Sequence, residues 1–327
     1  MLHHMINDHD RLLQTELSRR TVLKYSIAGL AGLAFGSQTL QTLSAHGAGS
    51  LLAPSNLRVD GLPPLFCIAY IDPDIPSQAN QESLIARYPL TLVPQDMRAT
   101  HVQWRDRIKQ LNPNIVMLAY LVVIEETTVP GPGHGRMRLV KDAWCVYPGG
   151  FHPTVRVGPS PRDFRIFDPR KVEWQEAFLD ACRITLQSYP YDGLFLDQCT
   201  VYEKAHPFPG VKVEMRQALQ IALLRLRQEF PNKIFIGNSR FNWQGLNGEL
   251  NEGRPESLSA EVAPFDGHVQ PTMDLYNTIL KGPNDIERVK REMALAHSLG
   301  THYSAAVNYQ HVLWFEVFDE IIARYNK

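Results

Sequence analysis

The chain has 327 residues, of which 44% are hydrophobic and 20% are charged, and its formal net charge is −1. Such a composition is that of a globular protein with a sizeable core. The balanced charge argues against a nucleic-acid partner. The four cysteines show no CxxC spacing, which argues against a zinc or iron–sulfur centre.

The first residues have the features of an export signal. The pair Arg19 and Arg20 precedes a mildly apolar stretch rich in Gly and Ala, and the segment resembles a twin-arginine signal. We therefore expect residues 1–47 to form the signal, read by the twin-arginine export machinery, and residues 48–64 to form a lead-in segment. The mature protein is then periplasmic or extracellular, and the weak apolar stretch predicts no stable membrane insertion of the mature chain.

Short buried strands alternate with helices along the rest of the chain. Apolar runs bounded by turn residues predict strands at residues 65–71, 88–93, 115–124, 193–197, 233–238, 258–262 and 302–308. Apolar residues at helical spacing predict helices at residues 102–111, 213–230, 286–299 and 312–325. A further helix is expected to end near Ser188, with Asp168 as its N-cap and Pro169 at its first position.

This alternation predicts βα units around a parallel sheet, and thus an α/β protein. We expect residues 65–327 to form a (β/α)8 TIM-like barrel. Seven strands are evident, so either an eighth lies between residues 266 and 274 or the last unit is incomplete or irregular. A doubly wound open sheet is the alternative, although no GxGxxG motif follows the first strand, so nucleotide binding has no support.

The most informative segment runs from Tyr191 to Asp197. Its Gly-Leu-Phe-Leu core predicts a strand buried on both faces, and Asp197 lies at the carboxyl end, where α/β barrels carry their catalytic residues. Glu261 lies in a similar setting. Two carboxylates on either side of a glycosidic bond are the general solution to its hydrolysis, one as acid and one as nucleophile or base. The alternative for Asp197 is a structural cap.

Three short motifs also resemble a known group of enzymes. The segment from Phe164 to Pro169 with Trp174, the segment from Tyr191 to Asp197, and Ile236-Gly237-Asn238-Ser239 are similar to those of hypothetical glycosyl hydrolase families built on a TIM barrel. These include barrels of the polygalactosaminidase and α-galactosidase types. The resemblance implies that Asp197 is the nucleophile or essential carboxylate and that Glu261 is the general acid/base.

The other polar and aromatic residues near predicted strand ends are candidate substrate-binding groups. They are Asp72, Asp74, Tyr120, Glu125, Asn238, Arg240, Trp243 and Asn308. Together these features predict an exported glycoside hydrolase that cleaves a poly- or oligosaccharide without a cofactor or metal. Two alternatives stay open: a carbohydrate-binding barrel without activity, and a metal-dependent enzyme that uses Asp72, Asp74, Glu125 and histidines.

Overall fold

The structure is a computed structural model. It describes residues 65–69, 71–74, 80–127, 164–199, 211–238, 243–252, 275–280, 285–298, 301–307 and 318–319. The chain divides into two compact units, Met1–Leu52 and Ala53–Lys327. The predicted export signal and lead-in segment lie outside the described residues and stay predictions.

Strands and helices alternate along the second unit. The strands are β1 (Phe66–Ile68), β2 (Leu90–Pro94), β3 (Val116–Val122), β4 (Glu125–Thr127), β5 (Phe164–Ile166), β6 (Gly193–Asp197), β7 (Ile234–Asn238), β8 (Gly248–Glu252), β9 (Leu275–Leu280) and β10 (His302–Val307). The helices are α2 (Glu82–Ile85), α3 (Ala99–Leu111), α4 (Val172–Ser188), α5 (Val211–Glu229) and α7 (Ile286–Ser298). Among the described helices, none combines the length and apolar character needed to span a bilayer.

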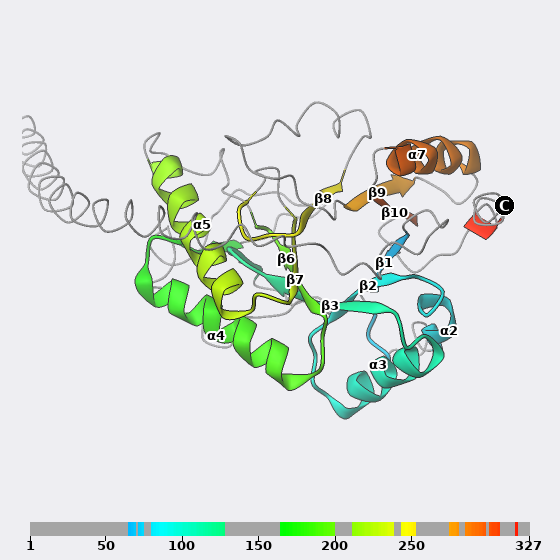
Figure 1. Cartoon of the computed structure of the whole chain (residues 1–327), viewed down its shortest axis with the longest axis horizontal. Helices are drawn as coiled ribbons and strands as arrows, with labels where there is room; N and C mark the ends of the chain where they lie inside the picture. The colour runs from blue at the N-terminus through cyan, green and yellow to red at the C-terminus, as the bar shows by residue number, and fades with distance from the viewer. Residues whose placement is uncertain are drawn as a thin grey trace, which may run out of the picture. The chain divides into compact units, whose positions relative to one another are not determined.

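Eight of these strands form one sheet in the order β1-β2-β3-β6-β7-β8-β9-β10. Every neighbouring pair is parallel. A parallel bridge between Leu65 and Tyr303 connects the two ends of the sheet. The predicted parallel α/β sheet is therefore confirmed, and its pairing is that of a TIM-like barrel (Figure 1).

The sheet separates two apolar layers. Alternate residues such as Phe66, Ile68 and Phe195 pack together on one face, and this cluster is the interior of the barrel. The intervening residues, such as Cys67 and Leu194, belong to a larger cluster that includes helix side chains. Strands such as β3, β6 and β7 are thus covered on both faces, which explains why they read as continuous apolar runs.

The helices bury one face each against the outer layer. In α3 the Trp104 side chain is fully buried, as are Trp174 and Phe178 of α4, whose rings stack at 5.4 Å. Helices α4 and α5 lie side by side (Figure 1). At about 25 cal/mol per Å² of apolar surface, burial of these large side chains is a major source of stability.

The amino-terminal end of β6 is fixed by two close contacts. Oδ2 of Asp192 accepts hydrogen bonds from the backbone N–H of Met117, at 2.8 Å, and from Nζ of Lys109, at 3.1 Å. A Cβ atom on the next residue, Gly193, would come within 1.8 Å of the carbonyl oxygen of Ile234 in β7. This position therefore requires glycine, and the Asp-Gly pair begins the strand.

Two features differ from the sequence-based expectations. The sheet contains β8 and β9, neither of which was predicted; β9 begins just beyond the interval proposed for a hidden strand, and the expected strand at 258–262 lies outside the described residues. The helix expected after β10, at residues 312–325, lies largely outside the described residues, so the expectation for the last unit stays a prediction.

The second difference concerns Asp168, which does not cap α4. That helix begins at Val172, with Lys171 at the N-cap. The Asp168 carboxylate instead accepts two side-chain hydrogen bonds from Arg170, at 2.8 and 2.9 Å, so ion pairing outcompetes capping here.

Candidate active site at the carboxyl end of the barrel

Asp197, the last residue of β6, has its carboxylate held by three donors. Oδ1 accepts a hydrogen bond from Nδ2 of Asn238 and one from the backbone N–H of Gln198, each at 2.8 Å. Oδ2 accepts a hydrogen bond from the hydroxyl of Tyr120. The side chain is half-buried at the edge of the sheet where the strands end. The predicted position of Asp197 at a strand end is therefore confirmed.

The register of three neighbouring strands explains this arrangement. Tyr120 in β3 pairs with Phe195 in β6, and their rings stack at 5.7 Å. Because side chains two residues apart point to the same face, the Tyr120 hydroxyl reaches Asp197, two residues beyond Phe195. Asn238 occupies the end of β7, and β6 and β7 pair in parallel up to Leu196 and Gly237.

The hydrogen bonds around Asp197 determine what it can do chemically. Both of its oxygens act as acceptors, which is the bonding pattern of an ionised carboxylate. The next residue, Gln198, has a φ of 53°, in the left-handed region that non-glycine residues seldom adopt. This turn directs the Gln198 N–H back to the carboxylate. A carboxylate held by three donors in this way could act as a nucleophile or as a fixed negative charge.

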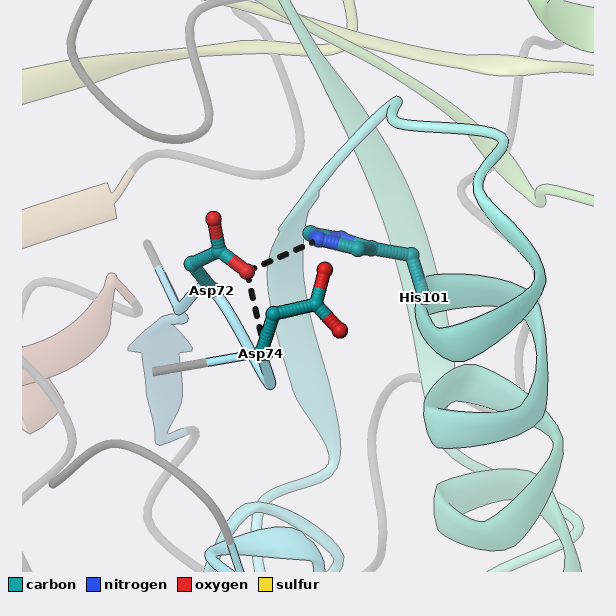
Figure 2. A group of neighbouring side chains, drawn as sticks. All are labelled: Asp72, Asp74 and His101. Atoms are coloured by element: carbon teal, nitrogen blue, oxygen red, sulfur yellow. Dashed lines mark hydrogen bonds and ion pairs between the residues drawn. The ribbon is translucent and has the colours of Figure 1, made fainter. Parts of the chain in front are cut away.

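A second polar group, the Arg98 cluster, lies at the ends of β1 and β2. It consists of Asp72, Asp74, Asp96, Arg98 and His101. The Arg98 guanidinium contacts all three carboxylates, Asp72 at 3.0 Å, Asp74 at 2.5 Å and Asp96 at 2.8 Å. Figure 2 shows the Asp72 and Asp74 side chains and the His101 ring, which projects from α3 toward them.

The Arg98 cluster lowers the pKa of two of its carboxyl groups. Partial burial by itself raises the pKa of Asp72, but hydrogen bonds from Arg98 and from the Asp74 N–H, with the guanidinium charge, outweigh it and hold the pKa below its ordinary value. The pKa of Asp96 is lowered in the same way, with burial opposed by the backbone and side-chain N–H groups of Arg98. Both groups are therefore ionised at neutral pH.

Two predicted substrate-binding residues have other contacts. Tyr120 is 2% exposed and its hydroxyl donates a hydrogen bond to Asp197. Its role is therefore to hold that carboxylate, rather than to bind substrate as predicted. Trp243 is 5% exposed and its indole Nε1–H donates to the carbonyl of Cys199 at 2.8 Å. This burial contradicts the predicted substrate-binding role of Trp243, because an aromatic ring that binds a sugar needs an open face.

Of the remaining candidates, the structure describes the backbone of Glu125 and not the other three. Glu125 begins β4, where it pairs with Ile166 of β5. Glu261, Arg240 and Asn308 lie outside the described residues. The predicted pairing of Asp197 with Glu261 therefore stays a prediction.

The fold adds a second acid position that the sequence reasoning missed. The sixth strand of the sheet is β8, and its last residue is Glu252, which pairs with Asn277 of β9. In β8, Leu250 pairs with Asn238 of β7. Glu252 thus occupies the carboxyl end of the sixth strand, the position that the sequence analysis gave to Glu261. The only apolar side chain in Gly248–Glu252 is Leu250, so the sequence carries little signal for this strand.

Comparison with known proteins gives a likeness in fold. No protein-family model matches the chain, and no curated protein matches its sequence. Among solved structures, the α-galactosidase TtGalA from Thermus thermophilus in complex with stachyose is 15% identical, with a TM-score of 0.51; the match covers 83% of this chain and 66% of that one. A variant of the GH36 α-galactosidase AgaA from Geobacillus stearothermophilus, also with stachyose, is 10% identical, with a TM-score of 0.50 and coverage of 80% and 41%.

At these identities the similarity concerns the fold. This chain spans about two thirds of the length of the first enzyme and less than half of the second. The TIM-like architecture of the described strands therefore agrees with that of solved glycosidases, and the chemistry must be argued from the side chains.

Proposed function

We propose that this protein is a glycoside hydrolase that cleaves O-glycosidic bonds in a poly- or oligosaccharide. The observation that carries the proposal is the Asp197 carboxylate, held by Tyr120, Asn238 and the Gln198 N–H at the carboxyl end of a barrel strand. Barrel enzymes carry their catalytic groups at this end. The similarity in fold to two α-galactosidases is consistent with the proposal.

In this mechanism Asp197 acts as the ionised carboxylate. Glycoside hydrolysis passes through an oxocarbenium-like transition state, whose positive charge a fixed carboxylate stabilises or attacks. The three hydrogen bonds hold the Asp197 oxygens in place before the reaction, so little reorganisation is required when the charge develops. The leaving oxygen needs a proton from a second carboxyl group.

Two residues are candidates for that second group. Glu252 ends the sixth strand of the sheet, and Glu261 is the residue that the sequence analysis favours. The separation of the two catalytic carboxyl groups fixes the stereochemistry: about 5–5.5 Å for retention of the anomeric configuration and about 6.5–9.5 Å for inversion. Either acid would serve the same proposed reaction.

The test is a hydrolysis screen on several glycan classes with the wild type and four variants. Asp197→Asn keeps the size of the side chain and removes its charge, and Glu252→Gln and Glu261→Gln do the same for the two candidate acids. Asp180→Asn is the matched control, because Asp180 is exposed on α4 and pairs with Arg183. We expect Asp197→Asn to lower kcat by about a thousandfold or more, since the charge it removes stabilises the transition state.

The result also distinguishes the two acids. We expect one of the two Gln variants to lose activity. If the enzyme is retaining, azide should restore the turnover of that variant on a substrate with a good leaving group. Sugar binding without hydrolysis by the wild type would favour the carbohydrate-binding alternative. Full activity of Asp197→Asn would refute the proposed role of this carboxylate.

A further inference from the structure

The Arg98 cluster contains three side chains with the geometry of a metal-binding group. Asp72 and Asp74 follow β1, and His101 lies in the first turns of α3 (Figure 2). One ligand atom from each lies within 4.8 Å of the other two. Two carboxylate oxygens and one imidazole nitrogen at this spacing can bind a single ion, because metal–ligand bonds of about 2.0–2.3 Å put the ligand atoms less than 4.8 Å apart.

His101 supplies an observation that is independent of the acidic residues. Its side chain is 1% exposed, its ring points into the cluster, and its Nδ1 has no hydrogen-bond partner. Burial of a polar nitrogen without a partner has a cost in stability. The buried ring presents its other nitrogen, Nε2, to the Arg98 and Asp72 side chains.

The surroundings of the His101 Nε2 atom also point to a cation. This nitrogen lies 2.7 Å from Nη2 of Arg98 and 3.3 Å from Oδ1 of Asp72. The Arg98 N–H needs a lone pair on Nε2, whereas the Asp72 oxygen needs a hydrogen there, and one nitrogen cannot provide both. A metal ion between Nε2 and Oδ1 would use the lone pairs of both atoms.

The charge balance of the cluster leaves room for such an ion. Three carboxylates (Asp72, Asp74 and Asp96) and one guanidinium (Arg98) sum to two negative charges, without the His101 imidazole. The Arg98 side chain is 49% exposed, so its guanidinium can move toward solvent when another cation enters. Arg98 is then a competitor for the site.

We propose that Asp72, Asp74 and His101 bind a divalent first-row transition ion at the rim of the barrel. Mixed oxygen and imidazole ligands suit Mn²⁺ or Zn²⁺, whereas Ca²⁺ takes six to eight oxygen ligands. A metal-binding histidine almost always donates the N–H of its second nitrogen to an acceptor, and loss of that acceptor weakens metal binding by about 10–100-fold. Since Nδ1 of His101 has no acceptor, we expect moderate affinity, with Kd on the order of micromolar.

The experiment titrates the full chain, freed of metals with a chelator, with Mn²⁺ and follows the free ion by electron paramagnetic resonance. Mn²⁺ is the probe because isolated surface histidines bind it more weakly than other first-row ions. The chain also carries histidines near its start, so Zn²⁺ would give background binding. Parallel titrations with Ca²⁺ in place of Mn²⁺, followed by calorimetry, test the choice of ion.

Three variants make the result specific. Asp74→Asn removes a partly exposed ligand and should weaken Mn²⁺ binding by about tenfold or more. Asp180→Asn is the control, since it also removes an exposed carboxylate paired with an arginine, and should leave binding unchanged. Arg98→Gln removes the competing cation and should tighten binding by about fivefold, the effect of one unit charge a few ångströms away through water.

Thermal melts confirm that each variant is folded before it is titrated. One saturable Mn²⁺ site, weakened by Asp74→Asn and strengthened by Arg98→Gln, supports the proposal. The proposal is overturned if the wild type shows no saturable binding, or if Asp74→Asn and Asp180→Asn bind alike. Weaker binding in Arg98→Gln would also contradict it, because the guanidinium would then support the ion rather than compete with it.

Discussion

The close approach of β6 and β7 at Gly193 yields a quantitative prediction for Gly193→Ala. The added Cβ would lie 1.8 Å from the carbonyl oxygen of Ile234 and 2.7 Å from its nitrogen, whereas real Cβ contacts stay above 3.0 Å. The clash is with backbone, so no side-chain rotation relieves it. The two strands must separate by more than 1 Å at this point.

The cost follows from the interactions that this separation disrupts. The Ile234 N–H donates to the Asp192 carbonyl at 3.0 Å, and β6 and β7 pair from Gly193 onward. Loss of one or two backbone hydrogen bonds, at about 1 kcal/mol each, adds to an overpacking cost of about 1–3 kcal/mol. We therefore expect Gly193→Ala to lower the free energy of unfolding by about 2–5 kcal/mol, out of a typical total of about 5–15 kcal/mol.

Gly237→Ala in the neighbouring strand is the matched control. Its Cβ would meet Cδ1 of Leu246 at 2.7 Å, which is the end of a flexible side chain, and Cβ of Cys199 at 3.4 Å. We expect a cost of about 1 kcal/mol, because Leu246 can rotate away. Urea denaturation followed by circular dichroism measures both variants. Equal losses of stability in the two variants would refute the backbone-clash argument.

Two further predictions concern the charged groups at the carboxyl ends of the strands. Because the folded-state pKa values of Asp72 and Asp96 are lowered, their ion pairs with Arg98 stabilise the fold above about pH 4, and this contribution is lost as the pH falls through the lowered values. The Tm difference between the wild type and Arg98→Gln should therefore shrink between about pH 4 and pH 2; a difference that stays constant over this range would contradict the assignment. For Tyr120→Phe, loss of a hydrogen bond to a carboxylate, worth about 1.5–3 kcal/mol, should lower kcat by about 10–100-fold with little change in KM. An unchanged kcat would remove Tyr120 from the support of Asp197.

The sequence predicts the strands that form continuous apolar runs and misses those in which polar residues interrupt the run. The Leu, Phe and Ile runs of β3, β6 and β7 identify them because helices and barrel interior cover both sides. In β8 the sequence Gly-Glu-Leu-Asn-Glu is mostly polar, so its single central Leu250 gives too weak a signal. In β9 the sequence Leu-Tyr-Asn-Thr-Ile-Leu has two polar residues at its centre, which interrupt the apolar run.

The site was predictable only in part for a similar reason. A strand-ending acid such as Asp197 is visible in the sequence because its strand is. The support from Tyr120 depends on the register between β3 and β6, which the order of residues does not reveal. The Arg98 cluster likewise brings together separate loops and the start of α3, and no local pattern connects Asp72 with His101.

The bridge between Leu65 and Tyr303 has a consequence for the order in which the molecule is assembled. One edge of β1 pairs with β2, but the other must wait for β10, the last of the eight strands that the ribosome makes. Until β10 emerges, both margins of the growing sheet present unpaired backbone groups, the kind of surface on which nascent chains aggregate. A chain truncated before β10 should consequently be a preferred client of chaperones, even though it contains every residue of the Asp197 network.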